Sequence, residues 1–127
     1  MSQVVFDSSA VLALLHGEPG DDLVLSLAPN AVLSAVNAAE VQTRLIQRGA
    51  APMRAWESVL SSVRAIVSFD ESMAETAGSL ISKTQPYGLS LGDRACLALG
   101  LAIHAPVYTA DRAWSQLQVG ATIRLIR

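Results

Sequence analysis

Short apolar runs alternate with longer segments of helical periodicity along this 127-residue chain, and this alternation limits the fold more than any other feature. Such short runs, rich in β-branched residues, predict buried strands. No hairpin signal joins neighbouring runs, which favours parallel strands connected by right-handed helical crossovers. The pattern predicts an α/β three-layer sandwich, with a central parallel sheet of about four to five short strands and helices on both faces. The expected strands are Val4–Phe6, Ala31–Leu33, Ala65–Phe69, Val107–Thr109 and Thr122–Ile126.

Capping signals place the helices between these strands. Ser34 is a favourable N-cap for a long helix that ends at Gly49, and Ser90 opens a helix over Leu91–Ile103 that is apolar on almost every side. A helix without a polar face is usually buried. Further helices are expected at Ser8–Leu15, at Asp21–Ala28, from Pro52, from Asp70 to about Lys83 and, in a short form, from Asp111, with a turn at 85–88.

The composition fits one globular domain over residues 1–127. Hydrophobic residues make up 51% of the chain and charged residues 16%, which excludes intrinsic disorder. The net charge of −2 disfavours a protein that binds duplex nucleic acid by charge alone, because that affinity needs many phosphate contacts. Cys96 is the only cysteine, so disulfide frameworks and cysteine-based zinc sites are excluded. No signal peptide or membrane span is predicted, and we expect a cytoplasmic protein.

Two aspartates follow predicted strands. Asp7 comes directly after Val4–Phe6, and Asp111 follows Val107–Thr109 with one residue between them. The carboxyl ends of parallel strands share one edge of a sheet, and ligands bind beyond that edge. Each aspartate is also a good helix N-cap, and for either one alone capping is the simpler interpretation. Their shared place on one edge favours a function.

Two more acidic residues lie on predicted helices. Asp93 is in the first turn of the apolar helix, where capping with Ser90 and pairing with a cation are equally good interpretations. Glu40 shares a helix face with Asn37 and Arg44. That face is either a solvated stripe with a Glu40–Arg44 ion pair or part of a functional site.

Four segments of the chain, in order, resemble the four acidic motifs of PIN-domain ribonucleases, and most of all those of the VapC-like toxins of bacterial toxin–antitoxin modules. The segments are VVFDSSAVLALLHGEPG, LSAVNAAEVQTRLIQRG, LSLGDRACLALGLA and VYTADRAW. The resemblance spans Asp7 to Trp114 and implies a single PIN-like domain. It places the acidic positions at Asp7, Glu40, Asp93 and Asp111, and it matches Ser8 and Thr109 to hydroxyl residues of the motifs.

The resemblance implies a metal-dependent endoribonuclease that hydrolyses RNA phosphodiester bonds, the toxin of a toxin–antitoxin system. The four acidic residues are then the expected catalytic residues and ligands of Mg²⁺, with Mn²⁺ able to substitute, because hard cations prefer carboxylate oxygens. The implied protein partners are a cognate antitoxin that covers the active site and a second copy of the chain in a homodimer. Residues expected to contact substrate or support the site are Ser8, Thr109, Arg94, Arg112, Asn37 and Arg44. Arg94 and Arg112 suit ion pairs with neighbouring carboxylates equally well.

Two other classes that use carboxylates fit less well. Phosphotransfer of the haloacid-dehalogenase kind needs Asp-x-Asp after the first strand, where this chain has Asp7-Ser8-Ser9. A signalling receiver domain needs a lysine after its last strand, whereas Lys83, the only lysine, ends a predicted helix. The open alternative is a catalytically weak PIN-like scaffold that binds a protein partner, and metal binding distinguishes it from a nuclease.

Overall fold

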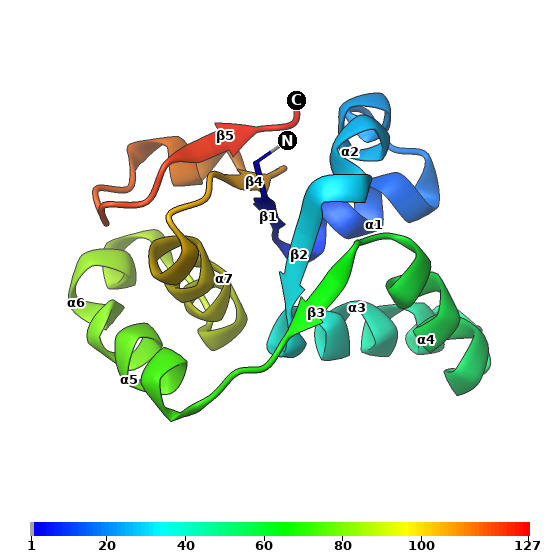
Figure 1. The fold of residues 1–127 in the computed structure, drawn as a ribbon, viewed down its shortest axis with the longest axis horizontal. Helices are drawn as coiled ribbons and strands as arrows, with labels where there is room; N and C mark the ends of the chain where they lie inside the picture. Colours follow the sequence, from blue (N-terminus) through cyan, green and yellow to red (C-terminus); the bar gives the residue numbers. More distant parts are fainter. Residues whose placement is uncertain (1) are drawn as a thin grey trace.

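A five-stranded parallel sheet forms the centre of the computed structural model, which describes residues 2–127 (Figure 1). The strand order is β3-β2-β1-β4-β5, so β1 is central and β3 and β5 are the edges. The strands are β1 (Val4–Phe6), β2 (Ala31–Ser34), β3 (Ala65–Val67), β4 (Val107–Thr109) and β5 (Ile123–Leu125). All neighbouring strands pair in parallel, which confirms the predicted sheet.

Helices cover both faces of the sheet, as Figure 1 shows. One face carries α1 (Ser8–His16), α2 (Asp21–Leu27), α3 (Ala35–Gln47) and α4 (Pro52–Ser61), and the other carries α5 (Glu71–Ser79), α6 (Ile81–Thr84) and α7 (Leu91–Ile103). Short 3₁₀ segments are η1 (Ala28–Asn30), η2 (Gln85–Tyr87) and η3 (Arg112–Gln116). The expected three-layer α/β sandwich is therefore confirmed.

Alternate residues of the central strands face opposite layers. Val4 and Phe6 belong to the core under α1–α4, whereas Val5 and Val32 belong to the core under α7. A strand buried on both faces needs apolar side chains at every position, which explains its continuous apolar run. Cys96 is completely buried in the second core, as a small hydrophobe would be.

Side-chain caps begin the helices at the carboxyl edge of the sheet. The Asp7 carboxylate accepts a hydrogen bond from the N–H of Ala10 (2.8 Å), and α1 begins there. The Ser34 hydroxyl accepts one from the N–H of Val36 (3.3 Å) at the start of α3. Because Asp7 directly follows β1 and Ser34 is the last residue of β2, the first turns of both helices lie over the same edge.

The segment from Asp70 to Lys83, predicted as one helix, is divided. The first helix, α5, ends at Ser79, and α6 begins again at Ile81. The Ser79 hydroxyl donates to the carbonyl of Glu75 (2.9 Å), a bond that competes with helix hydrogen bonds. Gly78, next to it, lowers helix propensity by about 1 kcal/mol relative to alanine. The strands beginning near 65 and 122 are also shorter than predicted.

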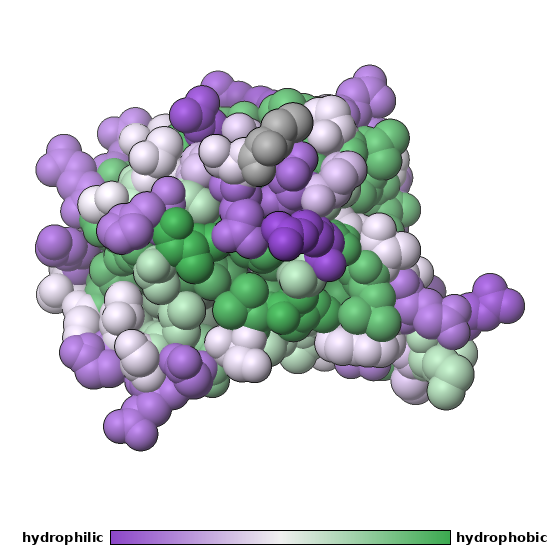
Figure 2. Space-filling model, in the orientation of Figure 1, coloured by the Kyte–Doolittle hydropathy of each residue, from purple (hydrophilic) through white to green (hydrophobic). Residues whose placement is uncertain are grey.

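Apolar side chains remain on part of the surface. In Figure 2 hydrophobic residues form a band across the middle of the face on which β2 and β3 lie in Figure 1, and hydrophilic residues lie around the rim and directly above the band. On the helices, Leu25 is 61% exposed and Leu60 is 50% exposed. Within residues 2–127, no helix combines the length and the apolar composition that crossing a bilayer requires.

Candidate active site

Asp7 lies at the carboxyl end of β1 and is almost completely buried. In addition to the N–H of Ala10, its carboxylate accepts hydrogen bonds from the hydroxyls of Ser9 (2.7 Å) and Thr109 (2.5 Å). Burial raises the pKa of Asp7 to about 6; the hydrogen bonds oppose this rise, and the charge of Asp93 adds to it. The carboxylate is thus fixed in place, and a nearby cation would stabilise its ionised form.

Ser9 and Thr109 join the ends of β1 and β4. The Thr109 hydroxyl, which donates to Asp7, accepts from the N–H of Asp111 (3.0 Å), and the Ser9 hydroxyl accepts from the N–H of Ala110 (2.8 Å). These bonds hold the backbone that carries Asp111 close to Asp7. Thr109 was predicted as a supporting residue, whereas Ser9 was missed. The available signal was its spacing, two residues after a capping aspartate.

Glu40 reaches the same place from the middle of α3. Its Oε1 atom accepts hydrogen bonds from the hydroxyl of Ser8 (2.7 Å) and from the side-chain amide of Asn37 (2.9 Å). Asn37 is buried, and its amide also donates to the backbone carbonyl of Gly92 (3.0 Å). One amide group therefore connects Glu40 on α3 with the first turn of α7.

Gly92 makes room for Glu40. A Cβ atom at residue 92 would overlap the Glu40 carboxylate. The alternative Glu40–Arg44 ion pair is wrong, because Glu40 takes its donors from Ser8 and Asn37, and within residues 2–127 Arg44 has no ion-pair partner. Gly92 was missed because nothing local in the sequence indicates a contact with so distant a residue.

Asp93 has both of the roles considered for it. Its side chain accepts from the N–H of Ser90 (3.0 Å), and the Ser90 hydroxyl accepts from the N–H of Asp93 (3.2 Å), which completes a capping box at the start of α7. The same carboxylate lines the pocket described below. Burial raises the pKa of Asp93, and the charges of Glu40 and Asp111 raise it further.

The four acidic side chains line one pocket of about 300 Å³. They come from the end of β1, from α3, from the start of α7 and from the segment after β4, where Asp111 also accepts from the N–H of Ala113 (3.0 Å). The remaining lining residues are Ser8, Ser9, Leu12, Arg44 and Trp114. Arg44 is the only cationic residue in this lining. Trp114 is buried and also forms part of the wall.

The donor set of the pocket suits a hard divalent cation. Four carboxylates and two hydroxyls line it, with neither cysteine nor histidine, and Mg²⁺ and Mn²⁺ prefer such oxygen donors. Within residues 2–127, no three carboxylate, imidazole or thiol groups meet at one point as the ligands of an ion do. Because Mg²⁺ keeps several waters and needs only one or two direct carboxylates, this arrangement fits an ion held partly through water.

Two arginines predicted to contact substrate lie elsewhere. The guanidinium of Arg94 donates to the backbone carbonyl of Ala77 on α5 (2.9 Å), and that of Arg112 donates to the carbonyl of Arg127 (3.0 Å). Neither arginine lines the pocket. Both follow a pocket aspartate, but neighbouring residues at the start of α7 or η3 do not face the same way. Their side chains therefore support the packing of α7 on α5 and the position of the C-terminal residue.

A family model described as PIN domain matches residues 4–120. A search of curated proteins found no match. Among solved structures, a toxin–antitoxin complex from Klebsiella pneumoniae shares 18% identity and a TM-score of 0.75, with 98% of each chain covered. DNA-bound VapBC from Salmonella typhimurium shares 15% identity and a TM-score of 0.75, with 100% of each chain covered.

VapC20 from Mycobacterium tuberculosis, described as a toxin that cleaves the sarcin–ricin loop, shares 16% identity and a TM-score of 0.73, with 94% of this chain and 99% of that chain covered. Similarity at such low identity concerns the fold. The family match is independent of it and runs from β1 to beyond η3, a span that includes all four pocket carboxylates. On that match, the chain belongs to the PIN domain family.

Proposed function

We propose that this protein is a metal-dependent endoribonuclease and the toxin of a toxin–antitoxin pair. The observation that carries the proposal is the gathering of Asp7, Glu40, Asp93 and Asp111 around one pocket. These residues are far apart in the sequence, and each is held by a cap or a hydrogen bond that fixes its direction. The pocket lies at the carboxyl edge of a parallel sheet, where such folds bind their ligands.

The residues of the pocket divide the proposed work between them. Asp7 and Asp93, the two more buried carboxylates, are the proposed direct ligands, and Glu40 and Asp111, which are exposed, complete the site or orient water. When bound, Mg²⁺ or Mn²⁺ supplies a water of lowered pKa and offsets charge on the phosphate. The hydroxyls of Ser9 and Thr109 favour the ionised form of Asp7, because both donate to it.

Two features support the proposal that this chain binds a protein partner. The structural neighbours include toxin–antitoxin complexes, among them the one from Klebsiella pneumoniae. This chain also leaves apolar surface uncovered, including a hollow lined in part by Leu25, Pro29 and Val63. We propose that an antitoxin covers the acidic pocket. We also propose that the exposed apolar residues contact the antitoxin and a second copy of the chain in a homodimer.

Cleavage of single-stranded RNA by the purified chain tests the proposal. We expect cleavage with Mg²⁺ or Mn²⁺, none with EDTA, and none by Asp93→Asn. Asp70→Asn is the matched control, because Asp70 also caps a helix but does not line the pocket. Equal cleavage by the parent and Asp93→Asn, or cleavage that persists in EDTA, would remove the proposed mechanism.

Metal binding separates a nuclease from a scaffold. We expect Mn²⁺ to raise the melting temperature of the parent, since a ligand at 100 times its Kd stabilises the native state by about 2.7 kcal/mol. Asp93→Asn should lose most of this gain, and Asp70→Asn should keep it. If calorimetry detects no Mn²⁺ binding by the parent, the alternative of a protein-binding PIN-like scaffold replaces the nuclease.

A further inference from the structure

The acidic pocket shares part of its lining with a second hollow, which lies on α3. This second hollow, which we call the α3 groove, has a volume of about 590 Å³ and is lined by Val36, Ala39, Glu40, Thr43, Arg44 and Gln47. Glu40 and Arg44 line both hollows. A ligand whose reacting group lies in the acidic pocket would therefore pass Glu40 and Arg44 and extend into the α3 groove.

The lining of the α3 groove is aliphatic near the start of α3 and polar towards its end. Val36 and Ala39 present aliphatic surface, and Thr43 and Gln47 carry a hydroxyl and an amide that donate and accept hydrogen bonds. Except for Val36, which is half-buried, these side chains are exposed to solvent. RNA-binding proteins hold unstacked bases by contact with the base face, commonly from aromatic or arginine side chains, and by hydrogen bonds to the base edges. In the α3 groove, aliphatic side chains and Arg44 are the groups available for contact with the base face.

Arg44 supplies the positive charge that a phosphate needs on the way from the acidic pocket to the α3 groove. It is the only cationic residue lining either hollow, and within residues 2–127 its guanidinium has no hydrogen-bond or ion-pair partner. Four carboxylates repel the phosphates of an approaching strand, and a guanidinium at the boundary of the pocket offsets that repulsion. Its planar group also suits bidentate contact with a phosphate.

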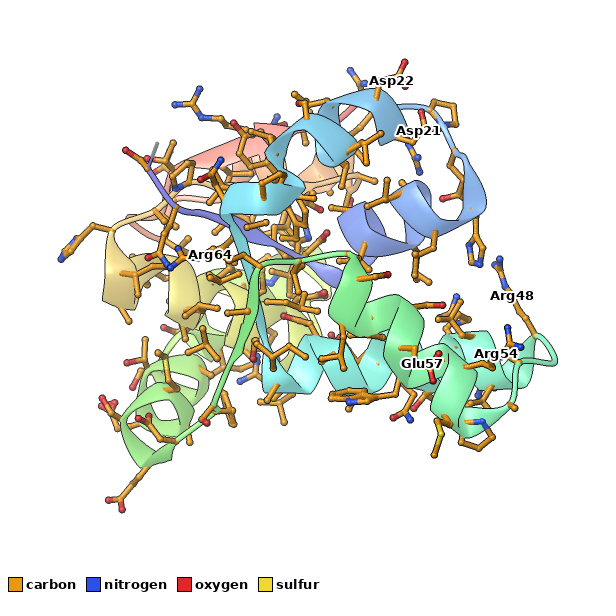
Figure 3. All side chains as sticks on the ribbon, turned by 45° about the vertical axis from the view of Figure 1, so that its right-hand side comes forward. Asp21, Asp22, Arg48, Arg54, Glu57 and Arg64 are labelled. Carbon is orange, nitrogen blue, oxygen red and sulfur yellow. The ribbon has the colours of Figure 1, made fainter. Side chains whose placement is uncertain are left out.

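A second arginine, Arg48, follows Arg44 in the direction in which the α3 groove leads away from the acidic pocket. Arg48 lies one turn beyond Arg44, where its Nη1 atom is 3.0 Å from Nδ1 of His16 at the end of α1. Figure 3 shows Arg48 at the far end of α3, whereas Arg64 lies at the start of β3. The amino end of a strand is opposite to the edge that carries the pocket, so Arg64 lies off this path.

We propose that the α3 groove is a subsite for the nucleotide next to the scissile phosphate of single-stranded RNA. The base lies on Val36 and Ala39, and Arg44 contacts the adjoining phosphate. This inference rests on the proposed function for its substrate class. It goes further by naming the side of the pocket along which the strand extends and the residues that hold it.

Binding of a fluorescently labelled single-stranded RNA of about 12 nucleotides tests the subsite. Fluorescence anisotropy in EDTA prevents metal-dependent cleavage. Arg44→Ala should raise Kd by about 10-fold and reduce the slope of log K against log salt by about 0.7, the value for one phosphate contact on a single strand. Ala39→Phe, which fills the groove from an exposed position, should also weaken binding by about 10-fold. Arg64→Ala is the matched control and should leave Kd unchanged.

The outcomes separate this inference from the proposed function. If RNA binds as expected but the parent does not cleave it with Mn²⁺, the nuclease fails and the subsite stands. Failure of the parent to bind RNA, or equal Kd values for the parent, Arg44→Ala and Ala39→Phe, overturns the subsite. So does a change in molecular mass by light scattering with Ala39→Phe, because the α3 face would then be an interface between copies of this chain.

Discussion

Asp7 and Asp70 have the same local role in very different surroundings. Asp7 follows β1 and accepts from the N–H of Ala10 (2.8 Å), and Asp70 follows β3 by a few residues and accepts from the N–H of Met73 (2.9 Å). Each caps the helix that follows. However, β1 is the central strand and β3 is an edge. Asp7 is buried among hydroxyls and other carboxylates, whereas Asp70 is exposed.

The difference between Asp7 and Asp70 shows that a capping aspartate becomes part of a site when the neighbouring strand brings other polar residues to it. Beside β1 lies β4, whose end brings Thr109 and Asp111 to Asp7. Beside β3 lies only β2, and Asp70 does not line the pocket that holds Asp7. The position of the strand in the sheet, which is a property of the whole fold, therefore separates a structural cap from a candidate ligand.

The largest expected contrast between the two aspartates is in RNA cleavage. Asp7→Asn should reduce cleavage with Mn²⁺ by about 100-fold or more, because even partners that only orient metal ligands cost about 10–100-fold. Asp70→Asn should cleave like the parent, since asparagine also caps helices well. Initial rates on the same RNA measure both. Comparable losses in the two variants would mean that capping alone explains Asp7.

The second contrast is in stability without metal. The pKa of Asp7 is raised from its ordinary value of 3.8 to about 6, so ionising this group destabilises the folded state by about 3 kcal/mol above pH 6. The penalty is absent below about pH 4 and grows as the pH rises towards 6. Asp7→Asn, which stays neutral, should therefore gain stability relative to the parent over this range.

Urea unfolding in EDTA at pH 4 and pH 7.5 measures this gain. Asp70→Asn should show no comparable change between the two pH values. A stability difference between Asp7→Asn and the parent that does not depend on pH would show that Asp7 ionises without a penalty.

Two glycines, one inside the site and one outside it, provide a similar contrast on the helices. At Gly92 a Cβ atom would overlap the flexible end of Glu40, so Gly92→Ala should move Glu40 away from Asn37 and Ser8 while the fold survives. We expect cleavage to fall by about 10–100-fold with little change in melting temperature. Unchanged cleavage would show that the position of Glu40 does not matter.

The smallest effect is expected at Gly78 on α5. Apart from its chain neighbours and the backbone of its own helix, no atom of residues 2–127 lies within 4 Å of a Cβ atom placed there. Gly78→Ala should raise the free energy of unfolding by about 0.4–1 kcal/mol, because alanine restricts the unfolded chain, and it should leave cleavage unchanged. Thermal unfolding measures the change in stability, and the RNA assay measures cleavage. A loss of stability would mean that this position is more tightly packed than the structure shows.

Much of the fold follows from signals that are local in the sequence. The apolar runs at Val4–Phe6 and Val107–Thr109 indicate buried strands, and Ser34 and Ser90 begin helices where a capping side chain predicts. The fold prediction holds because strand burial and helix caps depend on neighbouring residues. The divided helix after Asp70 is different, since Ser79 there bonds to the backbone carbonyl of Glu75, a choice that the apolar pattern does not reveal.

The contacts of the site are harder to predict because they join distant residues. The overlap of a Gly92 side chain with Glu40 and the bonds from Ser9 to the end of β4 exist only after the strands have paired. Adjacent residues were also misleading. Arg94 follows Asp93, yet its side chain donates to α5, whereas Arg44 lines the pocket from another helix.

The side-chain amide of Asn37 has a consequence for the molecule as a whole. It belongs to α3, which packs on one face of the sheet, and it donates to Gly92 in α7, which packs on the other. The same amide group also donates to Glu40 (2.9 Å) and so orients its carboxylate. If one helical layer slid against the other, Asn37 would move relative to Gly92, and the Glu40 carboxylate would be displaced. The position of this carboxylate in the pocket therefore depends on how the two helical layers are placed across the sheet.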